Sequence, residues 1–581
     1  MSTERVIASD EAKSVATFSI FSNETELPAS LSVLSIIVDR EVNRIPSATI
    51  MLRDGAASEE TFAVSDGEDF IPGSTIEIHA GYRNDEERLF KGIVVRHSVK
   101  VRKDLSVLIV ECRHACVNMT TRIASAYFHE MTDHDVADQL FGAHGISVET
   151  DGDAVDHAEL VQYDATDWDF LLCRAEANGW WVIPDDDAVR FAPPDFEADP
   201  ALTLQYGATV HELDLEIDAR LQYRQYRTLG WDPSTQEVLS QVEGEDPGAP
   251  PAGNITADAL AETTANETLE YRHGPIPETE LQSWANASRM RNRLGKIRGS
   301  ARTDGTAVPK PGDVVEILGA GERFEGRLMV TGVRHQIEKG NWQTVLQLGM
   351  SPERFAEQYR VHQPAAAALL PPVQGLQIGV VTNLEDPKGE DRVQVRMPLV
   401  QDADDGAWMR LASLDAGDQR GMVFRPEIGD EVVVGFFNSD PRHGVVLGML
   451  HSSSKPAPIP GSNDNHEKGY VSRSDIRIHV DDDRKVLTLS TPGGHEVVMD
   501  DDGTSITLKD SNGNSIVMDS NGITIESARD VTISAGVNMK YEAGADLEIS
   551  GGSSSKISGG AAAELSSGGN TAVKGSMVQI N

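Results

Sequence analysis

The chain has 581 residues, 39% of them hydrophobic, and 92 acidic against 51 basic residues give it a formal net charge of −41. This length predicts three or four domains with ordinary cores. So acidic a surface repels phosphate backbones, and nucleic acid is therefore excluded as an expected ligand.

Targeting and redox signals are sparse. The first residues have neither a basic start nor an apolar core, and no apolar run approaches about 18 residues. We therefore expect no signal peptide and no transmembrane helix, and a chain that folds in the cytoplasm. Cys112, Cys116 and Cys173 make no disulfide framework or zinc spacing and are interpreted as buried structural thiols.

Two linkers divide the chain. A Pro- and Ala-rich segment at 364–372 and a Ser- and Pro-rich segment at 453–465 are typical of tethers. They predict three domains, which span residues 1–363, 373–452 and 466–581.

The first domain contains an internal repeat. Residues 72–78 (PGSTIEI) resemble 311–317 (PGDVVEI), and each copy is followed by a Gly, valines, an Arg-His pair and another alternating strand. Two similar small β-barrels are predicted, at roughly 15–115 and 200–355, with α/β material between them.

Three helices are predicted between and within the barrels. Thr132 and Asp135 form a capping box that opens a helix through Leu140. A second helix over 167–177 ends at Asn178-Gly179. The third helix, 278–293, carries a basic face that we interpret as solvated or inter-subunit, made of Arg289, Arg291 and Arg293.

The second domain centres on the run PEIGDEVVVGF at 426–436, a turn that feeds a predicted buried strand from Val432 to Phe437. The domain offers no aromatic platform on which bases could stack. Its surface is instead acidic, with Asp402, Asp404, Asp405, Asp415, Asp418 and Asp440.

The third domain begins with apolar pairs at i and i+2, which place two side chains on one face of a strand. The pairs are Val497/Met499, Ile506/Leu508, Ile516/Met518 and Ile523/Ile525. Between them lie Asp-, Asn- and Gly-rich clusters that lack the spacing of a calcium loop and are predicted to be plain turns.

From about residue 521 the sequence repeats every eight residues. Apolar residues recur at Ile525, Ile533, Tyr541, Ile549, Ile557, Leu565 and Val573, and two places earlier at Ile523, Val531, Met539 and Leu547. Glycine recurs at Gly536, Gly544, Gly552, Gly560 and Gly568. The pattern predicts one short strand and one bend per octad, with the glycines at the corners.

One octad is too short to close a solenoid coil, which needs roughly 20 residues or more. Three octads suffice, so three chains winding about one axis are predicted. The spike would exist only as a homotrimer.

These segments resemble a known family. The second domain looks like the OB-fold of VgrG spikes and phage baseplate spikes, above all in its 426–436 run. The first is similar to the phage tail-hub domain, in Asn43-Arg44-Ile45-Pro46 and Asp167-Trp168-Asp169-Phe170 among other segments. The resemblance implies a mainly β fold with some α/β: tail-hub barrels, an OB-fold at 373–452 and an intertwined trimeric β-helix at 466–581.

The same resemblance implies a trimeric spike and hub at the tip of a contractile injection system, joining the hexameric inner tube to a cell-puncturing needle. Implied partners are inner-tube and baseplate proteins, a PAAR-type tip protein and effectors, with the target membrane met only on puncturing. The particle would be assembled in the cytoplasm and then act as a secreted, extracellular or cytoplasmic machine. A type VI secretion system and a phage-tail-like particle both remain open; the compact length slightly favours the latter.

Two other classes remain as alternatives, a trimeric adhesin or receptor-binding tail fibre and a spike-associated peptidoglycan hydrolase. The hub-like barrels and OB collar speak against the fibre. Only about 15 residues separate the OB block from the spike, too few for a catalytic domain. Residues 129–134 (HEMTDH) have the wrong spacing for two zinc ligands on one helix. We therefore expect no enzyme, no metal and no cofactor.

The C-terminal residues predict a docking platform. No His follows His495, so three copies cannot build the His-x-His iron site of some phage spikes. A blunt, apolar strand end invites a capping partner. The resemblance implies a PAAR-type cap, predicted to dock on Val573, Met577, Val578, Ile580 and Asn581.

Overall fold

The computed structural model describes residues 15–103, 105–239 and 242–580. Contacts divide the chain into two compact units, one up to Gln374 with residues 438–441, the other from Gly375 to Phe437 and from Arg442 onward. Asn581, one of the predicted cap contacts, lies outside the described residues. Among the helices of the described part, none is both long and apolar enough to cross a membrane.

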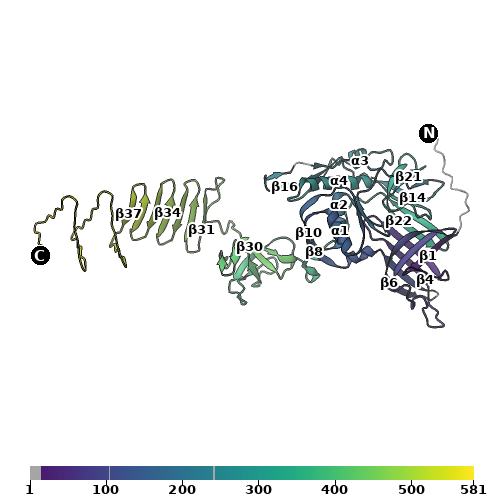
Figure 1. The fold of residues 1–581 in the computed structure, drawn as a ribbon, viewed down its shortest axis with the longest axis horizontal. Coiled ribbons are helices and arrows are strands. Elements are labelled where there is room, and N and C mark those ends of the chain that lie inside the picture. The colour runs from purple at the N-terminus through teal and green to yellow at the C-terminus, as the bar shows by residue number, and fades with distance from the viewer. Residues whose placement is uncertain (1–14, 104, 240–241, 581) are drawn as a thin grey trace. The chain divides into compact units, whose positions relative to one another are not determined.

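A 13-stranded sheet dominates the first unit (Figure 1). Its main path is β14 (Val210–Ile217), β20 (Ile297–Asp304), β23 (Asn341–Leu348), β22 (Gly326–Glu338), β3 (Val33–Glu41), β4 (Ser47–Arg53), β7 (Ser106–Arg113), β6 (Asp85–Val101), β5 (Thr75–Tyr82), β1 (Ala16–Ser22) and β2 (Thr25–Glu26), with β21 (Val314–Leu318) and β13 (Leu202–Gln205) branching from β22. The strands of both predicted barrel regions therefore share one sheet, joined where β22 pairs with β3.

The internal repeat is confirmed in the backbone of this sheet. Gly73 and Gly312 both have positive φ, 102° and 98°. Each lies just before a strand, β5 or β21, and donates its amide to a valine carbonyl on the next strand along the chain: Val94 of β6 at 2.9 Å and Val330 of β22 at 2.8 Å. A register shift follows each of these valines in the pairing with the next strand. The two copies thus fold alike down to the position of a β-bulge.

Smaller elements complete the unit. The sheets are β8 (Ile123–Thr132) with β10 (Asp156–Thr166), β9 (Val148–Thr150) with β12 (Val189–Ala192) and β11 (Trp181–Pro184), β15 (Gln225–Leu229) with β18 (Val242–Glu243) and β19 (Thr268–Arg272), and β16 (Trp231–Asp232) with β17 (Glu237–Val238). The helices are α1 (Asp133–Ala143), α2 (Asp167–Asn178), α3 (Ala257–Thr264), α4 (Glu278–Leu294) and α5 (Phe355–Gln358), with 3-10 turns at Ala115–Thr120 and Ala365–Ala368.

The predicted helix boundaries hold where a local signal set them. Thr132 caps α1 in a reciprocal capping box with Asp135. Gly179 ends α2 in the left-handed conformation, with φ 74°. Cys112 and Cys116 are buried, and burial raises the pKa of each thiol to about 12. Cys173 is only half-buried, and burial raises the pKa of its thiol to about 11.

The prediction of a solvated or inter-subunit basic face on α4 was wrong. Arg291 is 5% exposed and lies 3.2 Å from the carboxylate of Glu176 on α2. Arg293 pairs with Asp258 of α3 at 2.7 Å, and Arg289 donates to the carbonyl of Gly244. Acidic and carbonyl partners distant in the sequence therefore turn this face inward.

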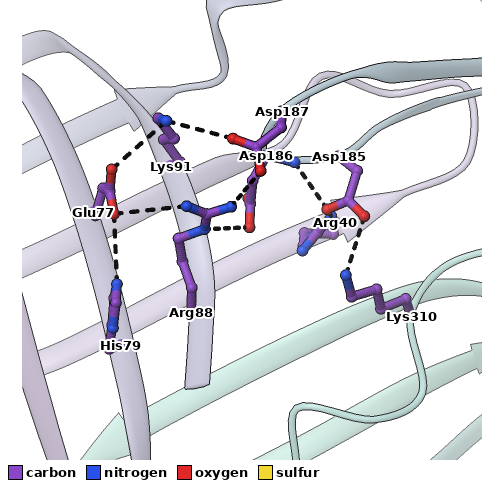
Figure 2. A network of polar contacts seen from close by, with 9 residues as sticks. All are labelled: Arg40, Glu77, His79, Arg88, Lys91, Asp185, Asp186, Asp187 and Lys310. Atoms are coloured by element: carbon purple, nitrogen blue, oxygen red, sulfur yellow. Dashed lines mark hydrogen bonds and ion pairs between the residues drawn. The ribbon is translucent and has the colours of Figure 1, made fainter. Parts of the chain in front are cut away.

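An acidic turn fastens the α/β insertion to the main sheet (Figure 2). Asp185 and Asp186, between β11 and β12, accept from Arg40 on β3 at 2.6 Å and from Arg88 on β6 at 2.8 Å. Lys310, just before β21, reaches Asp185 at 3.0 Å. Burial by itself would raise the pKa of Asp185, but Arg40 and Lys310 hold it well below its usual range. The turn thus ties strands from both copies of the repeat together.

A second polar network lies inside the insertion. The fully buried carboxylate of Asp133, at the start of α1, lies 2.7 Å from Arg174 of α2 and 3.0 Å from His157 of β10. Arg174 also reaches Glu280 of α4 at 2.8 Å. Burial acts to raise the pKa of Asp133, yet the bonds from His157 and Arg174 hold it well below its usual range. Four elements therefore depend on one carboxylate.

Asp133→Asn should lower the free energy of unfolding of this unit by about 3–5 kcal/mol, because it removes the fully buried carboxylate of the network and leaves Arg174 with Glu280 as its remaining carboxylate partner. The exposed Asp153→Asn should change it by less than about 0.5 kcal/mol. Urea unfolding at pH 7, followed by tryptophan fluorescence, measures both.

The stabilisation that the Asp133 carboxylate contributes should depend on pH. Because the pKa of Asp133 is lowered from its ordinary value of 3.8, its stabilisation is present above that pH and is lost as the pH falls below it. The difference between wild type and Asp133→Asn should therefore shrink in acid. Equal losses for the two variants at pH 7 would contradict the assigned role of Asp133.

The second unit begins with a closed five-stranded barrel, as predicted for the OB block. Its order is β24 (Gln377–Asn383), β25 (Val393–Arg396), β26 (Ala407–Leu411), β30 (Gly444–Met449) and β29 (Glu431–Phe436), with a small hairpin of β27 (Ala416–Gly417) and β28 (Arg420–Gly421) and a 3-10 turn at Phe437–Ser439. Val432 and Val434 are fully buried in its core, while Phe437, predicted as the end of the buried strand, is 56% exposed.

A seven-stranded antiparallel sheet follows (Figure 1). Its strands, each hydrogen-bonded to the next, are β31 (Glu467–Val471), β32 (Arg477–Asp481), β33 (Val486–Ser490), β34 (Glu496–Asp500), β35 (Ser505–Lys509), β36 (Ser515–Asp519) and β37 (Gly522–Glu526). The predicted plain turns are its hairpin loops: Asp510 accepts from the amides of Asn512 and Asn514, both at 2.9 Å. The predicted spike thus starts with strands that pair within the chain, whereas residues 527–580 contain no strand.

Candidate functional site: an apolar face along the spike

One face of the seven-stranded sheet is almost wholly apolar. Residues opposite each other in neighbouring antiparallel strands lie on the same face, and every second residue of a strand shares that face. The pairing of β31 to β37 therefore builds two columns across the sheet. One column is Tyr470, Ile478, Leu489, Val497, Leu508, Ile516 and Ile525; the other is Val480, Leu487, Met499, Ile506, Met518 and Ile523.

The opposite face is of a different character. Its central column is His479, Thr488, Val498, Thr507, Val517 and Thr524. Its flanks carry charged and hydroxyl side chains such as Arg477, Glu496 and Lys509. An antiparallel sheet with one apolar and one polar face typically packs its apolar face against other protein and leaves its polar face in solvent.

Within the single chain, the apolar columns are open. Leu489, Met499 and Leu508 are 39%, 45% and 40% exposed. A groove of about 770 Å³ runs along them, bordered by Ile478, Val497 and Ile525 among others. Fully burying a Leu or Ile side chain stabilises by about 1.5–3 kcal/mol. Nine of the thirteen column side chains are exposed in the single chain and four are half-buried. Covering all of them would add a free energy comparable with the net stability of a domain, about 5–15 kcal/mol.

The two columns continue into the octads. Ile523 and Ile525, which end the columns on β37, are also the first members of the two octad phases. Their successors are all exposed: Val531, Ile533, Met539, Tyr541, Leu547, Ile549, Ile557, Leu565 and Val573. One apolar stripe therefore follows the chain from β31 nearly to its end.

The octads also bend at regular places. Each of the five predicted corner glycines is the first residue of a two-residue bend, and further bends lie at 528–529 and 576–577. The six-residue segments between these bends have no helix or strand assigned. Their backbone has no strand partner in the chain, so partners must come from outside it.

The glycines at the bends are not required by the chain itself. A Cβ at Gly536, Gly544, Gly552, Gly560 or Gly568 would meet nothing within 4 Å. At two preceding positions the result is different: a Cβ at Gly551 would lie 2.7 Å from the carbonyl oxygen of Ser554, and one at Gly559 would lie 1.9 Å from that of Ala562. The repeated corner glycines therefore need a reason that lies in neighbouring chains.

The predicted cap contacts lie at the far end of the stripe. Val573, Met577, Val578 and Ile580 are 65%, 85%, 48% and 90% exposed, and Asn581 is outside the described residues. Elsewhere in the described ranges, no group of three or more His, Cys, Asp or Glu side chains is placed to hold a metal ion.

Comparison with known families accounts for this architecture. Residues 12–339 match the family described as Alg8 N-terminal domain, and residues 377–451 match the type VI secretion system/phage-baseplate injector OB domain. Residues 486–581 match the phage baseplate V C-terminal trimerisation domain. The chain belongs to the VgrG-type spike proteins of type VI secretion systems and phage baseplates.

Individual relatives are distant. The type VI secretion system spike protein VgrG1b of Pseudomonas aeruginosa is 23% identical over 380 residues, 58% of this chain and 48% of that protein. The actin cross-linking toxin VgrG1 of Vibrio cholerae is 24% identical over 341 residues, 53% of this chain and 29% of that protein. The chain thus spans half or less of the length of these two curated relatives.

A similarity to a solved structure has also been found. The 43 kDa tail protein of prophage MuSo2 from Shewanella oneidensis aligns with 58% of this chain and 98% of its own, at 12% identity and a TM-score of 0.45.

The in-chain pairing of β31–β37 was missed from the sequence of this VgrG-type spike, although a signal existed. Ile478/Val480 and Leu487/Leu489 are i, i+2 pairs like those that were recognised. Asp-rich turns separate them, and such turns reverse a chain. Read together, these features predict a meander and not a coil.

Gly552→Val tests whether neighbouring chains are the reason that glycine recurs at the corners. We expect this variant to lose most of its trimer on a native sizing column, because the added side chain has open space within its own chain and can only meet a neighbour. Gly461→Val is the matched control, since Gly461 also has open space around its Cβ but lies in the linker before the spike. Unimpaired assembly of Gly552→Val would show that the corner tolerates a side chain.

Proposed function

We propose that this VgrG-type chain is the trimeric spike and hub at the tip of a contractile injection system. In this role it joins the inner tube to a cell-puncturing needle. The observation that carries the proposal is the uninterrupted apolar stripe, which starts on a sheet paired within the chain and ends on octads without any partner in the chain.

Three chains about one axis would cover the apolar side chains of the stripe and would also supply strand partners for the octads. The apolar columns point toward the axis and cover one another, and the polar faces with their Thr, Asp and Lys side chains point to solvent. In the octads, each extended segment pairs with segments of its two neighbours. A needle in which every backbone group is paired and every apolar column is dry resists bending and unfolding.

The first unit is suited to bind the inner tube, at the end of the assembly opposite the needle. Each chain contributes two copies of the same strand arrangement, so three chains contribute six. A trimer with this internal repeat presents quasi-sixfold symmetry to a hexameric inner tube. The network around Asp185 fixes the insertion to the sheet, and the network around Asp133 holds the elements of the insertion together.

The partners and place of action follow from this role. The proposed partners are inner-tube and baseplate proteins at the hub, and a PAAR-type cap, with or without an effector, at the apolar end of the needle. The chain acts mechanically and catalyses no reaction. It is assembled in the producing cell and leaves it as part of the particle, and the printed names of its curated relatives support a type VI secretion system as that particle.

Ile506→Asp tests the trimer. Ile506 belongs to the second apolar column, so a carboxylate there would be buried at the axis without a partner. The wild-type chain should have a native mass of about 189 kDa, three times 62.9 kDa. Ile506→Asp should run as a monomer. Thr507→Asp, on the opposite face of the same strand, should remain a trimer, and a monomeric wild type would overturn the proposal.

Deleting residues 574–581 tests the cap. This deletion removes Met577, Val578 and Ile580 but leaves the apolar columns intact. We expect the trimer to persist while a co-expressed PAAR-type protein no longer co-purifies with it. Retention of the cap by the shortened trimer would place its binding site elsewhere.

A further inference from the structure

The OB barrel carries an apolar groove that its own chain does not fill. The groove has a volume of about 690 Å³ and runs beside the β27–β28 hairpin. Its apolar lining is Leu411, Leu414, Met422, Val423, Leu447 and Met449. Leu414 is 90% exposed, which is unusual for a leucine in an ordered segment.

The wall of this groove is held by hydrogen bonds and an ion pair within the chain. Ser413 donates its hydroxyl to the carbonyl of Met422 at 2.6 Å, and the amide of Met422 donates to Asp415 at 3.0 Å. Arg420 pairs with Asp415 at 2.7 Å across the hairpin. The wall that carries the exposed side chains is therefore held in place before any partner arrives.

The same barrel also projects an apolar knob. Leu399 and Val400, in the turn between β25 and β26, are 90% and 76% exposed. The turn is anchored by Arg396, which donates to the carbonyl of Asp402 at 2.8 Å, and by the amide of Val400, which donates to Met397 at 3.0 Å. Two adjacent apolar side chains are thus presented on a fixed turn.

We propose that Leu399 and Val400 of one protomer insert into the groove of the next protomer in the ring. The inference rests on the trimer of the proposed function and extends its interface from the spike into the OB barrel. A knob and a groove at different places on one chain form a head-to-tail contact, and such contacts close into rings. The apolar stripe of the spike sets the number of protomers at three.

The groove is continuous with the spike's apolar stripe. Phe424, at the groove, packs against Tyr470 with ring centroids 4.9 Å apart, and Tyr470 heads the first apolar column on β31. A second copy that covers the column therefore lies next to the groove. This continuity favours another copy of the chain over an unrelated protein as the occupant.

Cross-linking tests the contact. Cysteines are placed at Leu399 and Leu447 of the full chain, in a Cys173→Ser background, and the assembled protein is treated with a short bismaleimide. Because Leu399 is almost fully exposed, its replacement does not threaten folding. We expect most of the double variant to run on a denaturing gel as a covalent trimer of about 189 kDa, three times 62.9 kDa.

The controls separate this proposal from the trimer itself. The two single variants, and a pair combining Leu399→Cys with Asp502→Cys in an exposed spike turn, should stay monomeric on the gel. Native mass is measured before the reagent is added. A native trimer whose double variant links no more than the controls, or links only within one chain, overturns the knob-and-groove contact and leaves the trimer standing. A native monomer overturns both.

Discussion

A β-strand makes two demands, partners for its backbone and cover for its apolar side chains, and the organisation of this protein follows how each domain meets them. The large sheet of the first unit meets both with its own strands and helices. The OB barrel closes on itself around a small valine-rich core. The meander pairs its backbone but leaves its apolar columns open, and the octads do neither. Dependence on other chains thus increases toward the C-terminus.

This gradient suits the role proposed for the chain, which requires both assembly with other components and puncture of a target. The first unit pairs its main sheet and builds its core within one chain. The octads can adopt their structure only when three chains meet, because an isolated extended segment gains neither hydrogen bonds nor apolar burial to offset its conformational entropy. Folding and trimerisation of the octads are therefore expected to be one event.

Charge is distributed to serve the same division. Inside the first unit, carboxylates such as Asp133 and Asp185 are each held by Arg or Lys partners on other elements. A buried pair such as Asp133 with Arg174 contributes little net stability but makes wrong arrangements costly, since each would leave a charge unpaired. On the seven-stranded sheet, the charged residues of the strands, apart from Lys468, lie on the face opposite the apolar columns. The net charge of −41 therefore does not oppose the contacts along the axis.

The sequence by itself determined what depends on neighbours a few residues away. Caps, turns and strand alternation are short-range effects, so they could be predicted from the sequence. Examples are the capping box of Thr132, the end of a helix at Gly179, the turn clusters and the period of eight. Only the tertiary structure decided what pairs across long separations. It joined β22 to β3 in one sheet, turned Arg291 inward against Glu176 and folded 467–526 into a meander. Such pairings depend on which surfaces meet that are far apart in the sequence. The residues next to a given position in the chain do not determine which distant surface it will contact.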